Sequence, residues 1–515
     1  MSRIENVARN SIGQAASTLL STLLGFVGRV LFMRILGEEY LGVSGLFTSV
    51  IGVLSFADLG LASAFTFCFY KPISRKDTAH IQALLTAFKK VIFVIASFIT
   101  AAGLAVMPFL RILVKGADNI DDAHLYIYYL ITLASTVISY WLMYKTCYVT
   151  ARQEAYRLMP FTMVGNLVTV LLQIAALLFT RNYTVWALAA VVVSVGQRVV
   201  MDVYIRRRYP ETKSGATMPL PEEDKKSIIA NVKGIFMHKV GDICVNQTDN
   251  IIVSAYVSVI ATGLLSNYVL IKTTVMSFVI TIQSALMASM GDIMASENED
   301  VQLNVFFTYL MLNYCMVGFS VCAMGVLSTP FITLLFGAGK TVDALTVFLI
   351  CISFYITFQA GTVNVLSTAG GKFMLGAYAA IVEGISNLIF SVVAVKLMGL
   401  PGVFLGTVLS QIINYIIRPF PIFRGMYGIK PYKYFRFTVA LFGAAMVPYG
   451  VLLWLQKLIF AAGVTWGRFV AMAALTVLIF AASVWAFWHK NHYYNEAFGI
   501  VKGYMTKLME RKKGT

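Results

Sequence analysis

Residues 91–110 read VIFVIASFITAAGLAVMPFL, twenty residues in a row without a charged side chain. An α-helix rises about 1.5 Å per residue, so this segment is long enough to cross the ~30 Å hydrocarbon core of a bilayer. Similar stretches recur along most of the 515 residues, of which 58% are hydrophobic and 13% charged. A soluble domain has about a quarter charged residues. The composition therefore predicts an all-α membrane protein with no room for a sizeable soluble domain.

The apolar stretches predict about fourteen transmembrane helices. The first follows a short polar start that lacks the small-residue cleavage pattern of a signal peptide. The predicted spans lie near residues 12–36, 41–69, 84–110, 124–149, 157–180, 183–205, 232–256, 260–290, 302–336, 342–368, 373–397, 401–423, 434–457 and 467–488.

Positive charges orient these helices. With the N-terminus inside, the inner segments carry 24 Lys and Arg residues and the outer segments carry 6. Cytoplasmic loops of membrane proteins are enriched in Lys and Arg. The split predicts a multi-pass protein of a bacterial cytoplasmic membrane with both termini in the cytoplasm. It also accounts for the formal net charge of +17 without a nucleic-acid partner.

The longest polar stretch, at residues 206–227, combines prolines with mixed charge and predicts a cytoplasmic linker. Apolar residues of the basic tail recur on one helical face. The tail therefore either lies on the anionic inner leaflet or is an ordinary positive-inside tail. The predicted parts are an N-terminal six-helix bundle (1–205), the linker (206–228), a C-terminal six-helix bundle (229–425), two additional transmembrane helices (426–489) and the tail (490–515).

The span at 232–256, VKGIFMHKVGDICVNQTDNIIVSAY, carries a polar stripe. Its polar residues follow one another at spacings of 3, 4 and 3, which places them on one helical face. A charge at the bilayer centre costs at least about 2.5–3.5 kcal/mol, so this face cannot contact lipid. It either lines an aqueous cavity or binds the helix to its neighbours through an internal ion pair. The residues of the stripe are Lys239, Asp242, Asn246 and Asp249.

Bases on several other spans predict a cavity for an anionic substrate. Arg binds phosphate bidentately and Lys acts as a point charge, so such residues suit a phosphorylated cargo. The predicted cavity residues are Arg29, Lys145, Lys239, Lys272 and Asn246.

Acids inside the spans have two interpretations. They either bind a coupling proton or sodium ion, or they balance the charge of the bases. These acids are Asp58, Asp242, Asp249 and Glu383. Near the inner end of the sixth span, Arg198 and Asp202 are four residues apart and are predicted to pair with each other.

The chain has no sequence motif of an enzyme. It has no Walker A sequence, no GxSxG, and no pair of histidines at metal-ligand spacing. The six cysteines lie in apolar runs without the spacing of a metal site or a disulfide framework. We therefore expect no cofactor other than a coupling ion, and a non-enzymatic function.

Two stretches carry a family resemblance: RILGEEYLGVSGLFTSVIGVLSFADLGLASAFTFCFYKPISRKD (34–77) and HKVGDICVNQTDNIIVSAYVS (238–258). The first resembles the start of Wzx-like polysaccharide flippases, and the second the opening helix of their second half. These flippases are members of the multidrug/oligosaccharidyl-lipid/polysaccharide exporter superfamily.

The resemblance implies two six-helix bundles around a central cavity, which alternates between the two sides of the membrane without ATP. The implied cargo is an undecaprenyl-diphosphate-linked oligosaccharide for surface polysaccharide assembly, and the implied partners are glycan polymerases or glycosyltransferases. The two additional helices fit fourteen-helix members, in which they form a lipid-binding groove. The alternatives are a cation-coupled drug or lipid exporter of the same fold, and a membrane glycosyltransferase or polymerase.

Overall fold

The structure is a computed structural model that describes residues 24–55, 60–213, 218–229, 232, 247–296, 298–370, 375–499 and 502, with the backbone alone for 285–296, 369 and 377. No β-strand occurs among these residues. Within them, ten helices are long and apolar enough to cross a membrane. There are up to eleven if α6 (Asp122–Tyr140) and α7 (Met143–Ala151), which meet at a 40° bend, form one span. The prediction of an all-α polytopic membrane protein is confirmed.

Eleven of the fourteen predicted spans correspond to described helices or pairs of helices. The other three, at 12–36, 41–69 and 232–256, each include residues outside the described part. The second of these is covered on both sides of residues 56–59 by α2 (Glu38–Leu54) and α3 (Leu61–Arg75).

The chain folds as two compact units, Met1–Gly263 and Leu264–Thr515. The division falls within α12 (Val259–Ser296), whereas the sequence prediction separated the two bundles at the linker 206–228. The described part of that linker lies in the first unit.

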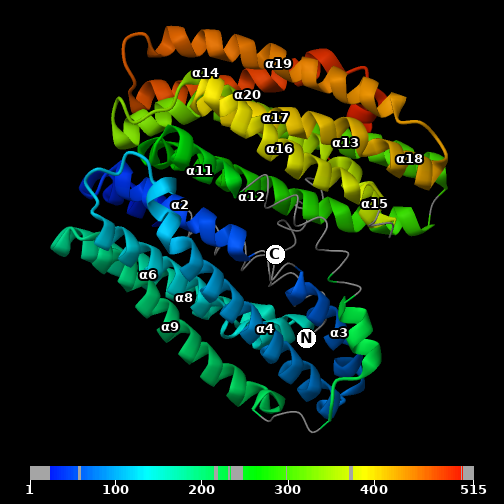
Figure 1. Cartoon of the computed structure of the whole chain (residues 1–515). Coiled ribbons are helices and arrows are strands. Elements are labelled where there is room, and N and C mark those ends of the chain that lie inside the picture. The colour runs from blue at the N-terminus through cyan, green and yellow to red at the C-terminus, as the bar shows by residue number, and fades with distance from the viewer. Residues whose placement is uncertain are drawn as a thin grey trace, which may run out of the picture. The chain divides into compact units, whose positions relative to one another are not determined.

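The first unit is built from antiparallel helix pairs. In Figure 1, α8 and α9 run side by side, and α6 packs against α9. Helices α3 and α4 both pack on α7. The bounds of the longer helices not given above are α4 (Thr78–Val106), α8 (Met159–Thr180) and α9 (Tyr183–Arg208).

Local sequence signals define the ends of these helices. Asp77 accepts a hydrogen bond from the backbone N–H of His80 and caps α4, at 3.0 Å. Asn182 caps α9 in the same way through the N–H of Thr184, at 2.7 Å. Short polar residues at this position satisfy backbone donors that a helix leaves unpaired. The backbone of Arg181 adopts the left-handed helical conformation, with φ 50°, and this lets the chain reverse tightly between α8 and α9.

Helices α16 and α17 of the second unit share the most extensive contact between any two of the described helices. A side chain at Gly402 would approach the carbonyl oxygen of Ala394 to 2.1 Å, and one at Gly406 would approach the backbone nitrogen of Ser391 to 2.3 Å. Glycine is therefore required at both positions for this contact. The helices of this unit are α13 (Glu299–Phe336), α14 (Ala344–Ala360), α15 (Thr362–Ala369), α16 (Ala377–Met398), α17 (Leu400–Ile417), α18 (Pro419–Tyr427), α19 (Tyr432–Phe460) and α20 (Trp466–Trp488).

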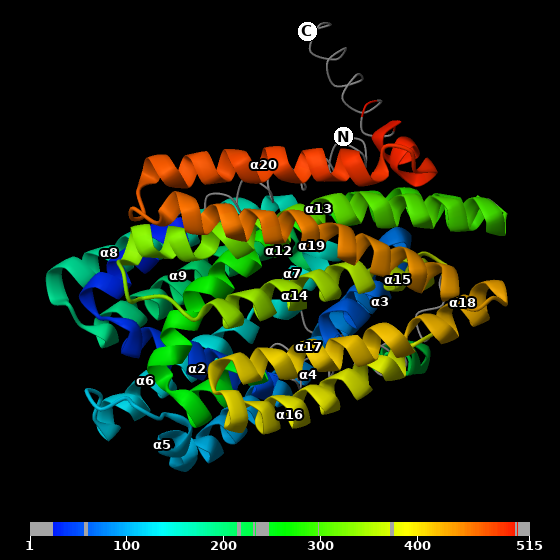
Figure 2. The same ribbon diagram turned by 90° about the horizontal axis from the view of Figure 1, so that it is seen from above.

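The two additional helices, α19 and α20, pack against each other and on α13 (Figure 2). The described start of the tail also contacts α13. Glu496 accepts hydrogen bonds from the side chains of Asn304, at 3.0 Å, and Thr308, at 2.6 Å. Tyr493 stacks on Phe307, with ring centroids 5.4 Å apart. The first turns of the tail are thus held on the protein.

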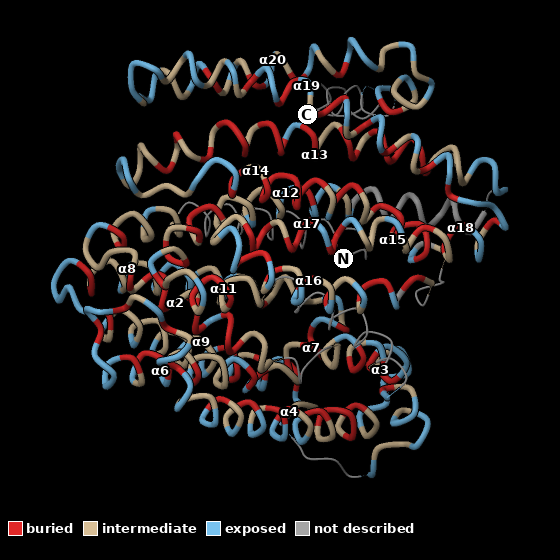
Figure 3. The backbone as a smooth tube through the Cα atoms, turned by 45° about the horizontal axis from the view of Figure 1, so that its top comes forward, coloured by how far each residue is buried: buried red, intermediate tan, exposed pale blue. Residues whose placement is uncertain are grey.

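Burial differs strongly between helices (Figure 3). Half of the apolar segment of α13 and 61% of that of 344–368 are buried, against 17% for α8 and for α9. Apolar helices that expose most of their surface are typical of a protein surrounded by lipid. The core of the second unit is therefore centred on α13 and α14.

Candidate functional site

Five of the nine predicted site residues lie in the described part of the chain. Arg29, Lys145 and Asp249 belong to the first unit, and Lys272 and Glu383 to the second. The other four, Asp58, Lys239, Asp242 and Asn246, lie outside the described residues, so their places in a cavity stay predictions.

The charge of Lys145 is not available to a substrate, because a carboxylate of the protein already pairs with it. Its side chain is 1% exposed, and its ammonium forms an ion pair with one carboxylate oxygen of Asp202 on α9. The other oxygen of Asp202 lies 2.7 Å from Nε of Arg206. The predicted pair of Arg198 with Asp202 is wrong, because both oxygens of Asp202 face other cations. The partner on the same helix is Arg206, four residues after Asp202, and not Arg198, four residues before it.

Arg29 lies on the helix of residues 24–35 and is partly buried. The same helix packs on the start of α9, where Phe32 contacts Trp186 with ring centroids 4.7 Å apart. Asp249 is partly buried on the short helix α11 (Thr248–Ile252). The amide of its neighbour Asn250 donates to the hydroxyl of Ser49 on α2, at 2.9 Å.

Helices α2 and α12 meet backbone to backbone within the first unit. A Cβ atom on Gly42 would lie 1.8 Å from the carbonyl oxygen of Val259, and one on Gly263 would lie 2.0 Å from that of Glu38. Real Cβ atoms do not approach so closely, so only glycine permits this contact. The contact lies at the end of these helices that the charge distribution predicts to be outer.

Hydrogen bonds add to this backbone contact between α2 and α12. The hydroxyl of Ser254 donates to the carbonyl of Leu113 at 2.7 Å, and the N–H of Val259 donates to the carbonyl of Lys115 at 2.8 Å. Glu39 accepts from the backbone and the side chain of Asn119, at 3.1 and 2.8 Å. A π-helical turn, Val253–Val257, connects α11 to this region. These contacts therefore hold two helices and two connections together at one end of the first unit.

A chain of amides crosses the second unit. The side chain of Gln283 on α12 donates to Asn313 on α13 at 2.7 Å, and Asn313 donates to Gln359 on α14 at 2.8 Å. Lys272 is a partly buried residue of the same α12. Glu383 on α16 accepts a hydrogen bond from the amide of Asn414 on α17. Polar side chains thus link most of the helices in this unit.

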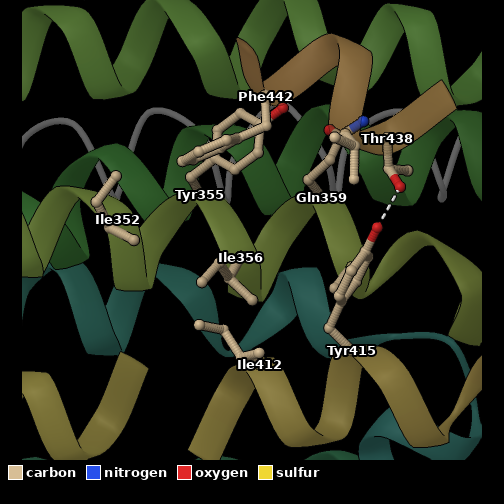
Figure 4. Close-up of a pocket in the computed structure, with 10 residues that line it drawn as sticks. Ile352, Tyr355, Ile356, Gln359, Ile412, Tyr415, Thr438 and Phe442 are labelled. Atoms are coloured by element: carbon tan, nitrogen blue, oxygen red, sulfur yellow. Dashed lines mark hydrogen bonds between the residues drawn. The ribbon is translucent and has the colours of Figure 1, made fainter. Parts of the chain in front are cut away.

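An apolar cavity of about 220 Å³ lies between α14, α17 and α19 (Figure 4). Ile352, Ile356 and Ile412 line it together with the ring of Phe442. The hydroxyls of Tyr415 and Thr438 pair with each other beside it, at 2.5 Å. Because α19 supplies part of the wall, the cavity depends on one of the two additional helices.

The start of the predicted linker is bound to the turn before α8. The hydroxyl of Tyr209 donates to Glu154 at 2.7 Å, and Glu154 lies 2.6 Å from Nε of Arg157. Burial raises the pKa of Glu154, but the hydrogen bond from Tyr209 and the charges of Arg157 and Arg152 outweigh it and lower the pKa overall. The same linker is held further on by a hydrogen bond between His80 and Asp224. It is therefore an ordered part of the first unit at these points.

Solved structures of known proteins match this arrangement, although no protein-family model and no curated protein matches the sequence. An inward-facing multidrug resistance MATE family transporter of the MOP superfamily has a TM-score of 0.64 and 14% identity, covering 81% of this chain and 98% of its own. The lipid II flippase MurJ, in an inward closed conformation, has a TM-score of 0.62 and 14% identity, covering 92% of this chain and 98% of its own. A MOP superfamily transporter from Pyrococcus furiosus has a TM-score of 0.54 and 15% identity, covering 83% and 96%.

The chain shares the fold of these solved structures. The resemblance seen in two sequence stretches pointed to the superfamily that their descriptions name, while its Wzx-like branch stays a prediction. In any membrane-spanning helix, polar groups inside the apolar segment mark candidate functional positions, because lipid cannot satisfy them. Within the described residues, no group of three His, Cys, Asp or Glu side chains is placed to hold a metal ion.

Sequence reasoning missed the features that depend on contact between distant segments. Gly42 and Gly263 are 221 positions apart, and nothing local distinguishes them from the other 36 glycines. The Gln283, Asn313 and Gln359 chain consists of uncharged amides, which a search for charged residues overlooks. These three residues could have been found in the sequence, because each is a polar amide inside an apolar span. Like a charged side chain, a polar one at that depth is costly unless it has a partner.

Proposed function

We propose that the protein is a flippase that moves a polyprenyl-diphosphate-linked oligosaccharide across the cytoplasmic membrane by alternating access. The observation that carries this proposal is the extent of the structural match. The lipid II flippase MurJ covers 92% of the chain, whereas the MATE structures cover 81 to 83%. The difference is roughly the combined length of α19 and α20, 29 and 23 residues. A flippase therefore accounts for more of this chain than a drug exporter does.

The cavity beside α19 supports a lipid-borne cargo. Its wall is formed by isoleucines and aromatic rings, and its volume of about 220 Å³ suits a section of an apolar chain rather than a whole sugar. A prenyl chain bound there would remain among apolar side chains while its polar head moves.

Cations inside the membrane support an anionic head group. Arg29 and Lys272 are the described candidates for contact with a diphosphate, together with Lys239 and Asn246 outside the described residues. Lys145 is a weaker candidate than the sequence suggested, because Asp202 neutralises its charge. Asp58, Asp242, Asp249 and Glu383 remain the candidates for a coupling proton or sodium ion.

The contact of Gly42 with α12 supports the alternating-access part of the proposal. Small residues let two helices pack backbone to backbone, so no space remains between the helices at this contact. We assign this contact to the outer gate of the transporter.

The proposal is tested with the purified full-length protein in liposomes that contain a fluorescent polyprenyl-diphosphate oligosaccharide. Wild-type protein should move the label between leaflets, and Arg29→Ala and Lys272→Ala, each tested alone, should reduce the rate about tenfold or more, because each variant loses a charge-assisted contact. Lys457→Ala, which removes an exposed cation from the end of α19, is the control and should leave the rate unchanged. Full activity of both single variants would refute the role of these cations.

A cation-coupled drug exporter is the second candidate, because the MATE structure has a TM-score of 0.64. The same liposomes distinguish the two. Transport of a lipophilic cation against a proton or sodium gradient, without movement of the glycolipid, would establish the exporter and exclude the flippase.

A further inference from the structure

Asp202 binds two cations at one end of the first unit, and further basic side chains lie close by on α4 and at the end of α9. Lys145 and Arg206 each bind one oxygen of the Asp202 carboxylate. Lys89 of α4 and Arg206 are close enough to Lys145 for their charges to act on it. Lys90 follows Lys89 on the same helix.

The charges of this group do not balance. Lys145 and Arg206 already occupy both oxygens of the Asp202 carboxylate, so neither oxygen is left for an ion pair with Lys89. Lys89 and Lys90 are exposed and have no hydrogen-bond or ion-pair partner among the described residues. The side chain of Arg206 is 54% exposed, so its guanidinium can accept a further anion while Nε remains on Asp202. The group therefore has positive charge available at its surface.

The depth of the group matches a lipid head group. The charge-free segment of α4 begins at Val91, directly after Lys90, and α9 ends in Arg206, Arg207 and Arg208. Side chains at the ends of apolar segments reach the level of the lipid phosphates. Lys145 and Asp202, buried behind them, hold α7 and α9 in a fixed position and orient Arg206.

We propose that Lys89, Lys90 and Arg206 bind a phosphate group carried by a lipid in the adjacent leaflet. The planar guanidinium of Arg206 contacts two phosphate oxygens, and the two ammonium groups neutralise the charge. The site lies wholly within the first unit, and its test measures lipid binding rather than transport.

Native mass spectrometry of the full-length protein, released from micelles that contain phosphatidylglycerol or phosphatidylcholine, tests this site. Wild-type protein should retain phosphatidylglycerol in preference to phosphatidylcholine. The variant Lys89→Gln/Lys90→Gln/Arg206→Gln should weaken this retention about tenfold or more, since each basic side chain contributes to attraction of an anionic lipid. Lys89→Gln/Lys90→Gln alone should weaken it less and leaves the contacts of Asp202 intact.

The matched control is Lys71→Gln/Arg75→Gln/Lys76→Gln, which removes three exposed cations from the end of α3. This control should retain phosphatidylglycerol within about twofold of wild type. Equal loss in both triple variants, or no loss in either, would overturn the proposal. Adding polyprenyl phosphate identifies the source: displacement of phosphatidylglycerol assigns the site to the transported lipid, and retention assigns it to a bilayer lipid. Both results require a phosphate site at these residues.

Discussion

Asp202 binds two cations that differ in their surroundings. Lys145 is 1% exposed and has no other ionic partner among the described residues, whereas Arg206 is 54% exposed. A buried charge that loses its partner is costly, because neither water nor a second ion replaces the lost contact. An exposed charge that loses its partner is rehydrated at little cost. The two sides of this ion pair should therefore respond differently to substitution.

We expect Asp202→Asn to destabilise the protein by about 3–5 kcal/mol, because it leaves Lys145 charged and buried. Lys145→Met should cost less, since Asp202 keeps Arg206. Adding Lys145→Met to Asp202→Asn should restore much of the lost stability. Thermal unfolding in detergent measures all three variants. If Lys145→Met lowers the stability as much as Asp202→Asn does, the unpaired charge of Lys145 is not the cause of the destabilisation.

Glu154 gives a prediction about pH. Its pKa lies below the ordinary value, so its ionised form stabilises the attachment of Tyr209. That stabilisation is fully present above the ordinary pKa of about 4.3 and is lost as the pH falls through the lower pKa of the folded protein. At pH 7, Glu154→Gln should speed hydrogen exchange at the amides of Tyr209, Glu211 and Thr212, after correction for intrinsic rates. Below the folded pKa, the difference from wild type should disappear.

The control for this prediction is Glu222→Gln, which removes an exposed carboxylate whose ion-pair partner within the described part of the chain is Lys225. Exchange at the same three amides should not change in this variant. A Glu154→Gln effect of equal size at every pH would contradict the ionic origin of the attachment.

At the scale of elements, two glycines determine how closely α2 and α12 approach. The cost of glycine in a helix is roughly 0.5–1 kcal/mol relative to alanine. At Gly42 and Gly263 this cost is smaller than the steric clash that any side chain would make with the neighbouring backbone. Gly443 on α19 has open space around its Cα and serves as the comparison.

Gly42→Ala should lower the melting temperature and slow transport, because the added Cβ forces α2 away from the carbonyl of Val259. Gly443→Ala should raise the melting temperature slightly, through the better helix propensity of alanine. Thermal unfolding and the liposome assay provide both readouts. Equal effects of the two substitutions would mean that the α2–α12 contact is not required.

At the scale of the whole molecule, the charge distribution predicts the orientation in the membrane. The first residues, the linker and the tail share the basic side of the chain, so both termini should lie in the cytoplasm. In a bacterial host, green fluorescent protein fused after Thr515 should fluoresce, and alkaline phosphatase fused there should be inactive. Alkaline phosphatase fused after Ala117, in a predicted outer loop, should be active. The opposite pattern would reverse the orientation, and with it the side assigned to the α2–α12 gate.

The sequence by itself determined the helices, because crossing a bilayer imposes a length and an apolar composition that each segment shows independently of the others. Eleven predicted spans correspond to described helices, and the superfamily resemblance in two stretches agrees with the structural matches. These are local properties, or sums of local properties, and they need no knowledge of which helices touch.

Only the tertiary structure decided which polar groups meet. Spacing on one helix suggested that Arg198 pairs with Asp202, but a neighbouring helix brings Lys145 to that carboxylate. The contact of Gly42 with Val259 and the cavity beside α19 likewise join segments that are far apart in the chain. A single helix determines the direction of its side chains, whereas the partner, the burial and the free space at their ends are set by the packing of other helices around it.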